Sequence, residues 1–201
     1  MQTRVEKKAD QAPPSQQQRL QALYREAERS ASQLMRKETL KEALALEPGN
    51  LHTRDLLLQT LLKTGPGNEL EQFLRDSLML FPNHLAFITS LAQLQMQHKA
   101  YAAASATLEG IDSNQTNEPA YLALLAASYQ QQKNFHNAAP IYQRLTQIQP
   151  EKAENWLGLA ICAENLQQRQ TAIQAYRQAL AKNTLNGEVV NYINQRLSAL
   201  N

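Results

Sequence analysis

The chain has 201 residues, a formal net charge of +2 and a hydrophobic content of 43%. This length allows a substantial core, and only six glycines argue against a β architecture built on tight turns. The charges are spread along the chain, so they do not form the basic stripe that is typical of nucleic-acid binding. Cys162 is the one cysteine, which excludes an intrachain disulfide, and we expect it to be buried rather than reactive.

Residues 1–15 are predicted to form a flexible linker. They mix charges of both signs, end near Pro13 and Pro14, and offer Val5 as the one sizeable core candidate after Met1. Such a segment does not offset its own ordering entropy. A linker suggests that further protein lies upstream, although an ordinary frayed terminus explains the composition equally well.

The segment 17–50 is predicted to be a degenerate first repeat of two helices. Leu20, Leu23 and Ala27 occupy its first half, and Leu40 and Ala43 its second. Its middle, near residues 30–33, contains no glycine or asparagine. We favour a short turn there, and one unbroken helix from about 16 to 46 is the alternative, because every residue tolerates a helix.

From residue 51 to residue 186 the chain repeats itself without a gap, with a period of about 34 residues. The rows 51–84, 85–118, 119–152 and 153–186 each predict two antiparallel helices. The turns are expected near residues 65–67, 98–100, 133–134 and 168–169. Pro140 lies six residues after Asn134, so the second helix of the fourth repeat either starts late or is kinked at Pro140.

Apolar residues at helical spacing after Gly187 predict a final helix over 187–200. We expect this helix to cap the stack, with Asn191, Asn194, Gln195 and Arg196 facing water.

Aligned positions of the repeats divide into small and large residues. Two columns are small, which allows the paired helices to approach closely; they contain Ala92, Ala126, Ala160 and Ala104, Ala138, Ala172. Large residues are expected to fill the space between them as a continuous core, namely Ile88, Leu122, Trp156, Tyr142 and Tyr176.

These residues carry a resemblance to a known family. The spacing of Trp156, Leu159, Ala172, Tyr176 and Ala179 resembles the tetratricopeptide repeat (TPR) signature, and the period of the rows is the TPR length. The resemblance implies an all-α, right-handed superhelical solenoid of about five TPR helix hairpins plus a C-terminal capping helix. It implies one TPR domain over 16–201.

Within that superfamily, four segments resemble the periplasmic repeat domain of the MshN family, the biogenesis proteins of the mannose-sensitive haemagglutinin (MSHA) type IV pilus. They are residues 43–50 (ALALEPGN), 80–84 (LFPNH), 155–160 (NWLGLA) and 192–197 (YINQRL). Family members carry an inner-membrane anchor, a Pro-rich linker and helical repeats. The resemblance implies a role in pilus assembly on the periplasmic side of the bacterial inner membrane, with other assembly components as partners. A membrane would be reached only through an anchor that this chain does not contain.

The first helix of each TPR lines the concave face of the stack, so this face is the predicted partner-binding surface. An amphipathic helix or an extended peptide could lie on its alanine floor, although the last helix could cover some of it. By register the surface consists of His52, Asp55, Gln59, Ala86, Thr89, Gln93, Met96, Ala120, Ala123, Ala127, Gln130, Glu154, Leu157, Ile161 and Glu164.

No P-loop, dinucleotide-binding glycine pattern, paired Cys-x-x-Cys or His-Glu-x-x-His is present. The four histidines, His52, His84, His98 and His136, fall in different parts of the repeats, which disfavours a metal site. The chain is therefore predicted to be a non-catalytic scaffold with no cofactor, metal, nucleic acid or small-molecule substrate. The alternative to a pilus scaffold is a generic peptide-binding TPR adaptor of another bacterial envelope or cytoplasmic complex.

Overall fold

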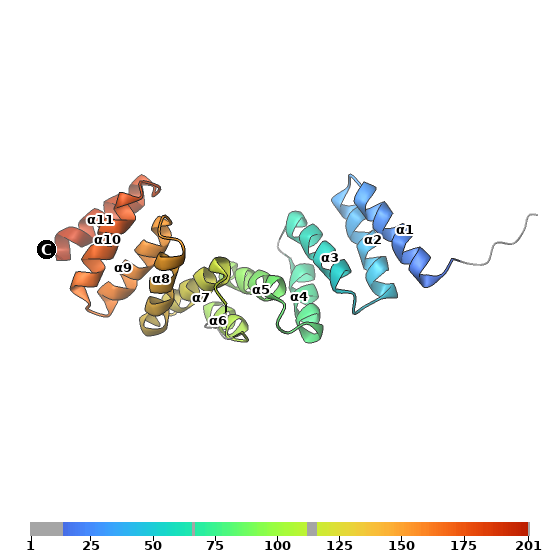
Figure 1. Ribbon diagram of the computed structural model, residues 1–201, viewed down its shortest axis with the longest axis horizontal. Coiled ribbons are helices and arrows are strands. Elements are labelled where there is room, and N and C mark those ends of the chain that lie inside the picture. Colours follow the sequence, from blue (N-terminus) through green and yellow to red (C-terminus); the bar gives the residue numbers. More distant parts are fainter. Residues whose placement is uncertain (1–13, 66, 112–115, 201) are drawn as a thin grey trace, which may run out of the picture. The chain divides into compact units, whose positions relative to one another are not determined.

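The computed structural model describes residues 14–65, 67–111 and 116–200, and these residues form eleven helices (Figure 1). No β-strand occurs in these three ranges. The predicted all-α class is confirmed. Residues 1–13, which make up most of the predicted linker, lie outside the described residues.

The chain divides into two compact units, residues 1–70 and 71–201. The first unit holds α1 (Gln16–Arg29), α2 (Gln33–Leu46), α3 (Leu51–Thr64) and the start of α4 (Asn68–Leu80). The second unit holds the rest of α4 and then α5 (Leu85–Gln97), α6 (Tyr101–Leu108), α7 (Pro119–Gln131), α8 (Phe135–Ile148), α9 (Ala153–Asn165), α10 (Arg169–Ala181) and α11 (Gly187–Leu200). One TPR domain spanning 16–201 stays a prediction.

The first repeat is a hairpin of two helices rather than one unbroken helix. Two serines start these helices, because each side chain satisfies a backbone amide that the helix leaves unpaired. Ser15 Oγ accepts from the Gln18 amide at 3.2 Å, and the Gln18 side chain accepts from the Ser15 amide at 2.8 Å. Ser32 Oγ accepts from the Met35 amide at 3.4 Å. Ser15 is thus part of a helix cap rather than of a linker.

Small residues bring the paired helices of the second unit together. The six alanines of the two small columns, from Ala92 to Ala172, are all fully buried. Ile88, Leu122, Tyr142 and Tyr176 are buried beside them, as the sequence predicts. The core of this unit is continuous through α5 to α11.

Trp156 departs from the predicted core. It is only half-buried, although it packs against the core, and its indole N–H donates to the Pro150 carbonyl at 2.7 Å. This residue lies in the first turn of α9, where the preceding loop is within reach of the ring. Trp156 therefore anchors the loop between α8 and α9 as much as it fills the core.

Cys162 is fully buried on α9, and burial raises the pKa of its thiol to about 12. The thiolate, which is the reactive form, is therefore scarce at neutral pH. The structure supports the prediction of an inert, apolar cysteine.

Pro140 lies inside α8 without ending it. Asn134 is the N-cap of this helix, and its side chain accepts from the Asn137 amide at 3.4 Å. The alternative of a late helix start is therefore wrong. Because proline has no N–H, the His136 carbonyl lacks its usual donor four residues on.

Three of the turns between paired helices use the same left-handed backbone conformation. Lys99, Lys133 and Gln167, which occupy one aligned position of successive repeats, have φ values of 59°, 60° and 60°. In each turn the next residue's amide bonds back to a carbonyl near the helix end, for example Gln168 to Ala163 at 2.8 Å. This is the hydrogen bond of the Schellman motif, in which glycine is the preferred residue. The last turn lies at Leu166–Gln168, slightly before its predicted place.

Gln167→Gly is therefore expected to stabilise the protein by about 0.5–1 kcal/mol, because glycine removes the steric penalty of a left-handed residue. Thermal unfolding would detect the rise in midpoint. Gln170→Gly, on the exposed surface of α10, is the matched control and should lower the midpoint, since glycine disfavours a helix. Equal shifts for the two variants would contradict the assigned turn.

Candidate partner-binding surface

The first helices of successive repeats lie next to each other in the second unit. Helix α5 contacts α7, and α7 contacts α9, while α6 packs on α7 and α8 packs on α9. The inner helices α5, α7 and α9 therefore form one face of this unit. This arrangement is the one from which TPR proteins build a concave binding surface.

Twelve of the fifteen predicted surface residues fall on this set of helices, and the first unit contributes the other three. His52, Asp55 and Gln59 lie on α3 of the first unit, whereas the other twelve lie on α5, α7 and α9 of the second. None of the fifteen is fully buried in the core. That they contact a partner stays a prediction.

An apolar strip runs from α7 to α9. Its members, Ala123, Ala127, Leu157 and Ile161, are half-exposed, and all except Ala127 pack against the buried core. Small side chains on α7 leave room above the helix, and the two larger ones on α9 make an apolar wall. Since no ionisable side chain is among these four, the strip suits the apolar side of a helix or peptide.

Several polar residues of the predicted surface are engaged within the protein. The Thr89 hydroxyl donates to the Leu85 carbonyl one helical turn earlier, at 2.8 Å. The His52 ring meets the Tyr24 ring of α1 edge-on, with ring centres 5.6 Å apart. The Thr89 hydroxyl is thus bonded within α5, and the His52 ring packs against α1.

Glu164 has a structural role, and its contact with a partner stays a prediction. Arg196 of α11 makes an ion pair with its carboxylate, and the Tyr176 hydroxyl donates to the same group at 2.7 Å. Only 13% of the Glu164 side chain is exposed. Arg196, predicted to face water, instead fastens the last helix to α9.

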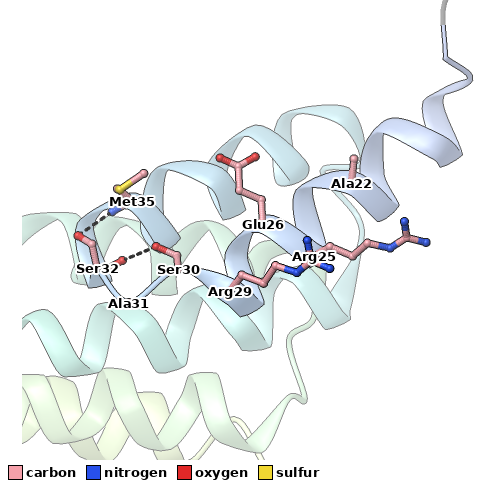
Figure 2. A pocket seen from close by; sticks show the side chains of 8 residues that line it. All are labelled: Ala22, Arg25, Glu26, Arg29, Ser30, Ala31, Ser32 and Met35. Atoms are coloured by element: carbon pink, nitrogen blue, oxygen red, sulfur yellow. Dashed lines mark hydrogen bonds between the residues drawn. The ribbon is translucent and has the colours of Figure 1, made fainter.

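The hollows of the surface were not predicted from the sequence. Two adjoin each other along α1 and α2, of about 660 and 410 Å³, and share Ala22 and Glu26; Figure 2 shows the larger, which also reaches Met35. A third, of about 340 Å³, lies beside Pro140 and Leu166 in the second unit. Met35, which lines the larger hollow and is 60% exposed, lies outside the buried columns of the repeat, and an apolar residue at such a position was the available signal in the sequence.

The described residues offer neither a metal site nor a membrane span. Within residues 14–65, 67–111 and 116–200, no group of three histidine, cysteine or acidic side chains is placed to hold a metal ion. None of the helices formed by these residues is both long and apolar enough to cross a membrane.

The fold and this surface are those of an all-α repeat protein, a class whose members generally act as protein-interaction scaffolds. The comparisons with known proteins agree. The family model described as Tetratricopeptide repeat matches residues 71–127, which include α5 and α6. Comparison with curated proteins finds no match.

Solved structures of MamA, a TPR protein, are similar to this chain. A MamA RS-1 double mutant has a TM-score of 0.71 and 16% identity, covering 82% of this chain and 94% of its own. A second MamA structure has a TM-score of 0.71 and 17% identity over 82% and 91% of the two chains. MamA from Desulfovibrio magneticus RS-1, from its residue 41 to the end, has a TM-score of 0.70 and 16% identity over 82% and 95%. At these identities the likeness shows a shared fold.

Proposed function

We propose that the protein is a TPR scaffold for assembly of an MSHA-like type IV pilus, and that a partner lies on the face formed by α5, α7 and α9. The TPR fold supports the coarser statement, a protein-interaction scaffold. The pilus is supported by the sequence resemblance of four short segments to the MshN family. The same resemblance supports a location on the periplasmic side of the bacterial inner membrane.

The single observation that carries the binding surface is the apolar strip of Ala123, Ala127, Leu157 and Ile161. Half-exposed apolar side chains in a row across two adjacent helices offer area to a partner without a large loss of hydration. The strip lacks cationic side chains, so a clamp for a partner's terminal carboxylate is disfavoured. We propose an amphipathic helix or an extended peptide segment as the occupant.

A generic peptide-binding adaptor of another envelope or cytoplasmic complex is the second candidate. The same apolar strip favours it, because the strip carries no feature specific to pilus proteins. The two candidates differ in which proteins are captured, and affinity purification followed by mass spectrometry distinguishes them.

Ala123→Arg and Ala127→Arg are expected to reduce partner capture at least tenfold, because each places a long charged side chain on the apolar strip. Both residues are half-exposed, so the fold should tolerate the change. The experiment is a pulldown from the source bacterium with the intact chain as bait. Capture of pilus assembly proteins by the wild type would support the first candidate.

Ala103→Arg is the matched control, because Ala103 is exposed on α6 and lies outside the strip. It should capture as much partner as the wild type. Undiminished capture by both strip variants would move the binding surface elsewhere.

A further inference from the structure

One face of α1 is exposed at positions that are buried in every later repeat. Arg19 and Glu26 are exposed. The residues at the equivalent positions of the later repeats are all buried, namely Thr53, Phe87, Tyr121 and Asn155 for the first, and Thr60, Leu94, Ser128 and Cys162 for the second. Among the first helices of the five repeats, in the part of the chain that the structure describes, α1 alone therefore presents these positions to solvent.

A helix covers these positions in the later repeats. Tyr121 of α7 donates its hydroxyl to the Leu108 carbonyl of α6 at 2.7 Å, and Asn155 of α9 donates its side-chain amide to the Leu145 carbonyl of α8 at 3.4 Å. Phe87 of α5 meets Phe73 of α4 with ring centres 6.3 Å apart. The Arg19 and Glu26 positions of α1, by contrast, are covered by no helix of the described residues.

The charges on this face determine which helix would fit. Arg19 and Glu26 are seven residues apart, which is about 10 Å along a helix and places them on one side. Neither makes an ion pair in the described residues. Ala22 and Leu23 lie between them, and Ala22 allows close approach. In Figure 2 the Glu26 side chain rises from one side of α1, whereas Arg25 and Arg29 extend from another.

We propose that this face binds a second copy of the chain, with the two α1 helices antiparallel about a two-fold axis near Ala22 and Leu23. An antiparallel copy brings Arg19 of each chain opposite Glu26 of the other, because the two residues are equidistant from that axis. A two-fold interface requires such self-complementarity, in which the same pair forms twice. Another antiparallel helix would need a base and an acid at the same spacing and in the same order along its chain.

The dimer is expected to be weak and sensitive to salt. Its contacts are two exposed ion pairs around a small apolar centre, and exposed pairs are screened by salt. The α1 face lies in the first unit and the apolar strip in the second, so this proposal does not depend on the proposed function. Loss of dimerisation and loss of partner capture are separate measurements.

Sedimentation velocity of the intact chain over about 10 μM to 1 mM tests the proposal, since weak complexes fall in this range. The wild type should self-associate, and raising the salt should weaken it. Arg19→Glu and Glu26→Arg should each weaken association at least tenfold. Each substitution gives residues 19 and 26 the same charge, so like charges lie opposite each other at both ends of the interface. The double variant should regain wild-type association, because it restores both pairs with their signs exchanged.

An equimolar mixture of the two single variants should also associate, as a heterodimer that contains both opposite-charge pairs. Arg177→Glu is the matched control, because Arg177 is an exposed arginine of α10 and its reversal changes the net charge equally. A monomeric wild type at every concentration would overturn the proposal. So would unchanged association of both single variants, or no recovery in the double variant.

Discussion

Gly158→Ala is expected to lower the thermal unfolding midpoint by about 4–8 °C, although alanine is the better helix former. A Cβ atom at this position would lie 2.3 Å from Tyr142 Cε1 and 2.4 Å from Cζ, far inside contact distance. The Tyr142 ring is only 8% exposed, so it has little room to move away. Overpacking by about 3 kcal/mol, less about 1 kcal/mol gained in helix propensity, leaves a loss of about 2 kcal/mol.

A second substitution at Tyr142 separates this clash from a general effect on α9. Leucine lacks the ring atoms nearest to Gly158, so Tyr142→Leu removes the obstacle but leaves a cavity. The double variant should be less destabilised than the sum of the singles, with a coupling of at least about 1 kcal/mol. Strictly additive losses would show that Tyr142 does not fill the space above Gly158.

The repeat period predicted the fold because each helix pair buries the same positions. Leu57, Leu91, Leu125 and Leu159 are all buried, as a constant column requires. The turns lack glycine at Lys99, Lys133 and Gln167, and the period located them nonetheless. The spacing of hydrophobic residues was therefore enough to predict the helices and turns wherever the same contact recurs in every repeat.

The repeat period could not predict contacts that occur in one repeat alone. Gly158 stands in a column with Leu56, Ser90 and Leu124, and only the bulk of Tyr142 explains why the column becomes a glycine. The sequence did contain a signal for this contact. A large residue in the fourth repeat, Tyr142, and a glycine in the fifth, Gly158, compensate each other in volume. The column positions alone do not say which residues of neighbouring rows meet.

The end of the stack could not be predicted for a related reason. Helix α11 has no later repeat against which to compare it, so the period assigns no register to its contacts. Its charge alone predicts that Arg196 faces water, whereas the structure pairs it with Glu164 on α9. Glu164, a residue of the predicted binding surface, therefore attaches α11 to α9.

Glu164→Gln is expected to loosen α11 by about 2 kcal/mol, since hydrogen bonds to a charged group contribute about 1.5–3 kcal/mol. The carboxylate accepts from both Arg196 and the Tyr176 hydroxyl and is largely shielded from water. A neutral amide retains part of the hydrogen bonding but loses the ion pair. Burial already raises the pKa of Tyr176, so this hydroxyl remains a neutral donor across the ordinary pH range.

Hydrogen exchange measures this loosening locally. Amides of residues 189–199 should exchange roughly 30-fold faster in Glu164→Gln, because about 1.4 kcal/mol corresponds to a factor of ten. Amides of α7 should be unchanged. Glu154→Gln is the matched control, because Glu154 is an exposed acid of the same helix. Unaltered exchange in α11 would mean that Ile193, buried in the core, holds this helix without the ion pair.

The ion pair itself is isolated by combining Glu164→Gln with Arg196→Gln. If the two residues act through their mutual contact, the double variant should be no less stable than Glu164→Gln alone, because the first substitution has already removed the pair. Full additivity would assign the stability to separate contacts of the two side chains. The distinction bears on function, because a partner that displaced Arg196 from Glu164 would release α11 from α9 as it bound. The apolar strip ends at Ile161, one helical turn before Glu164, so occupation of the surface and attachment of the last helix share α9.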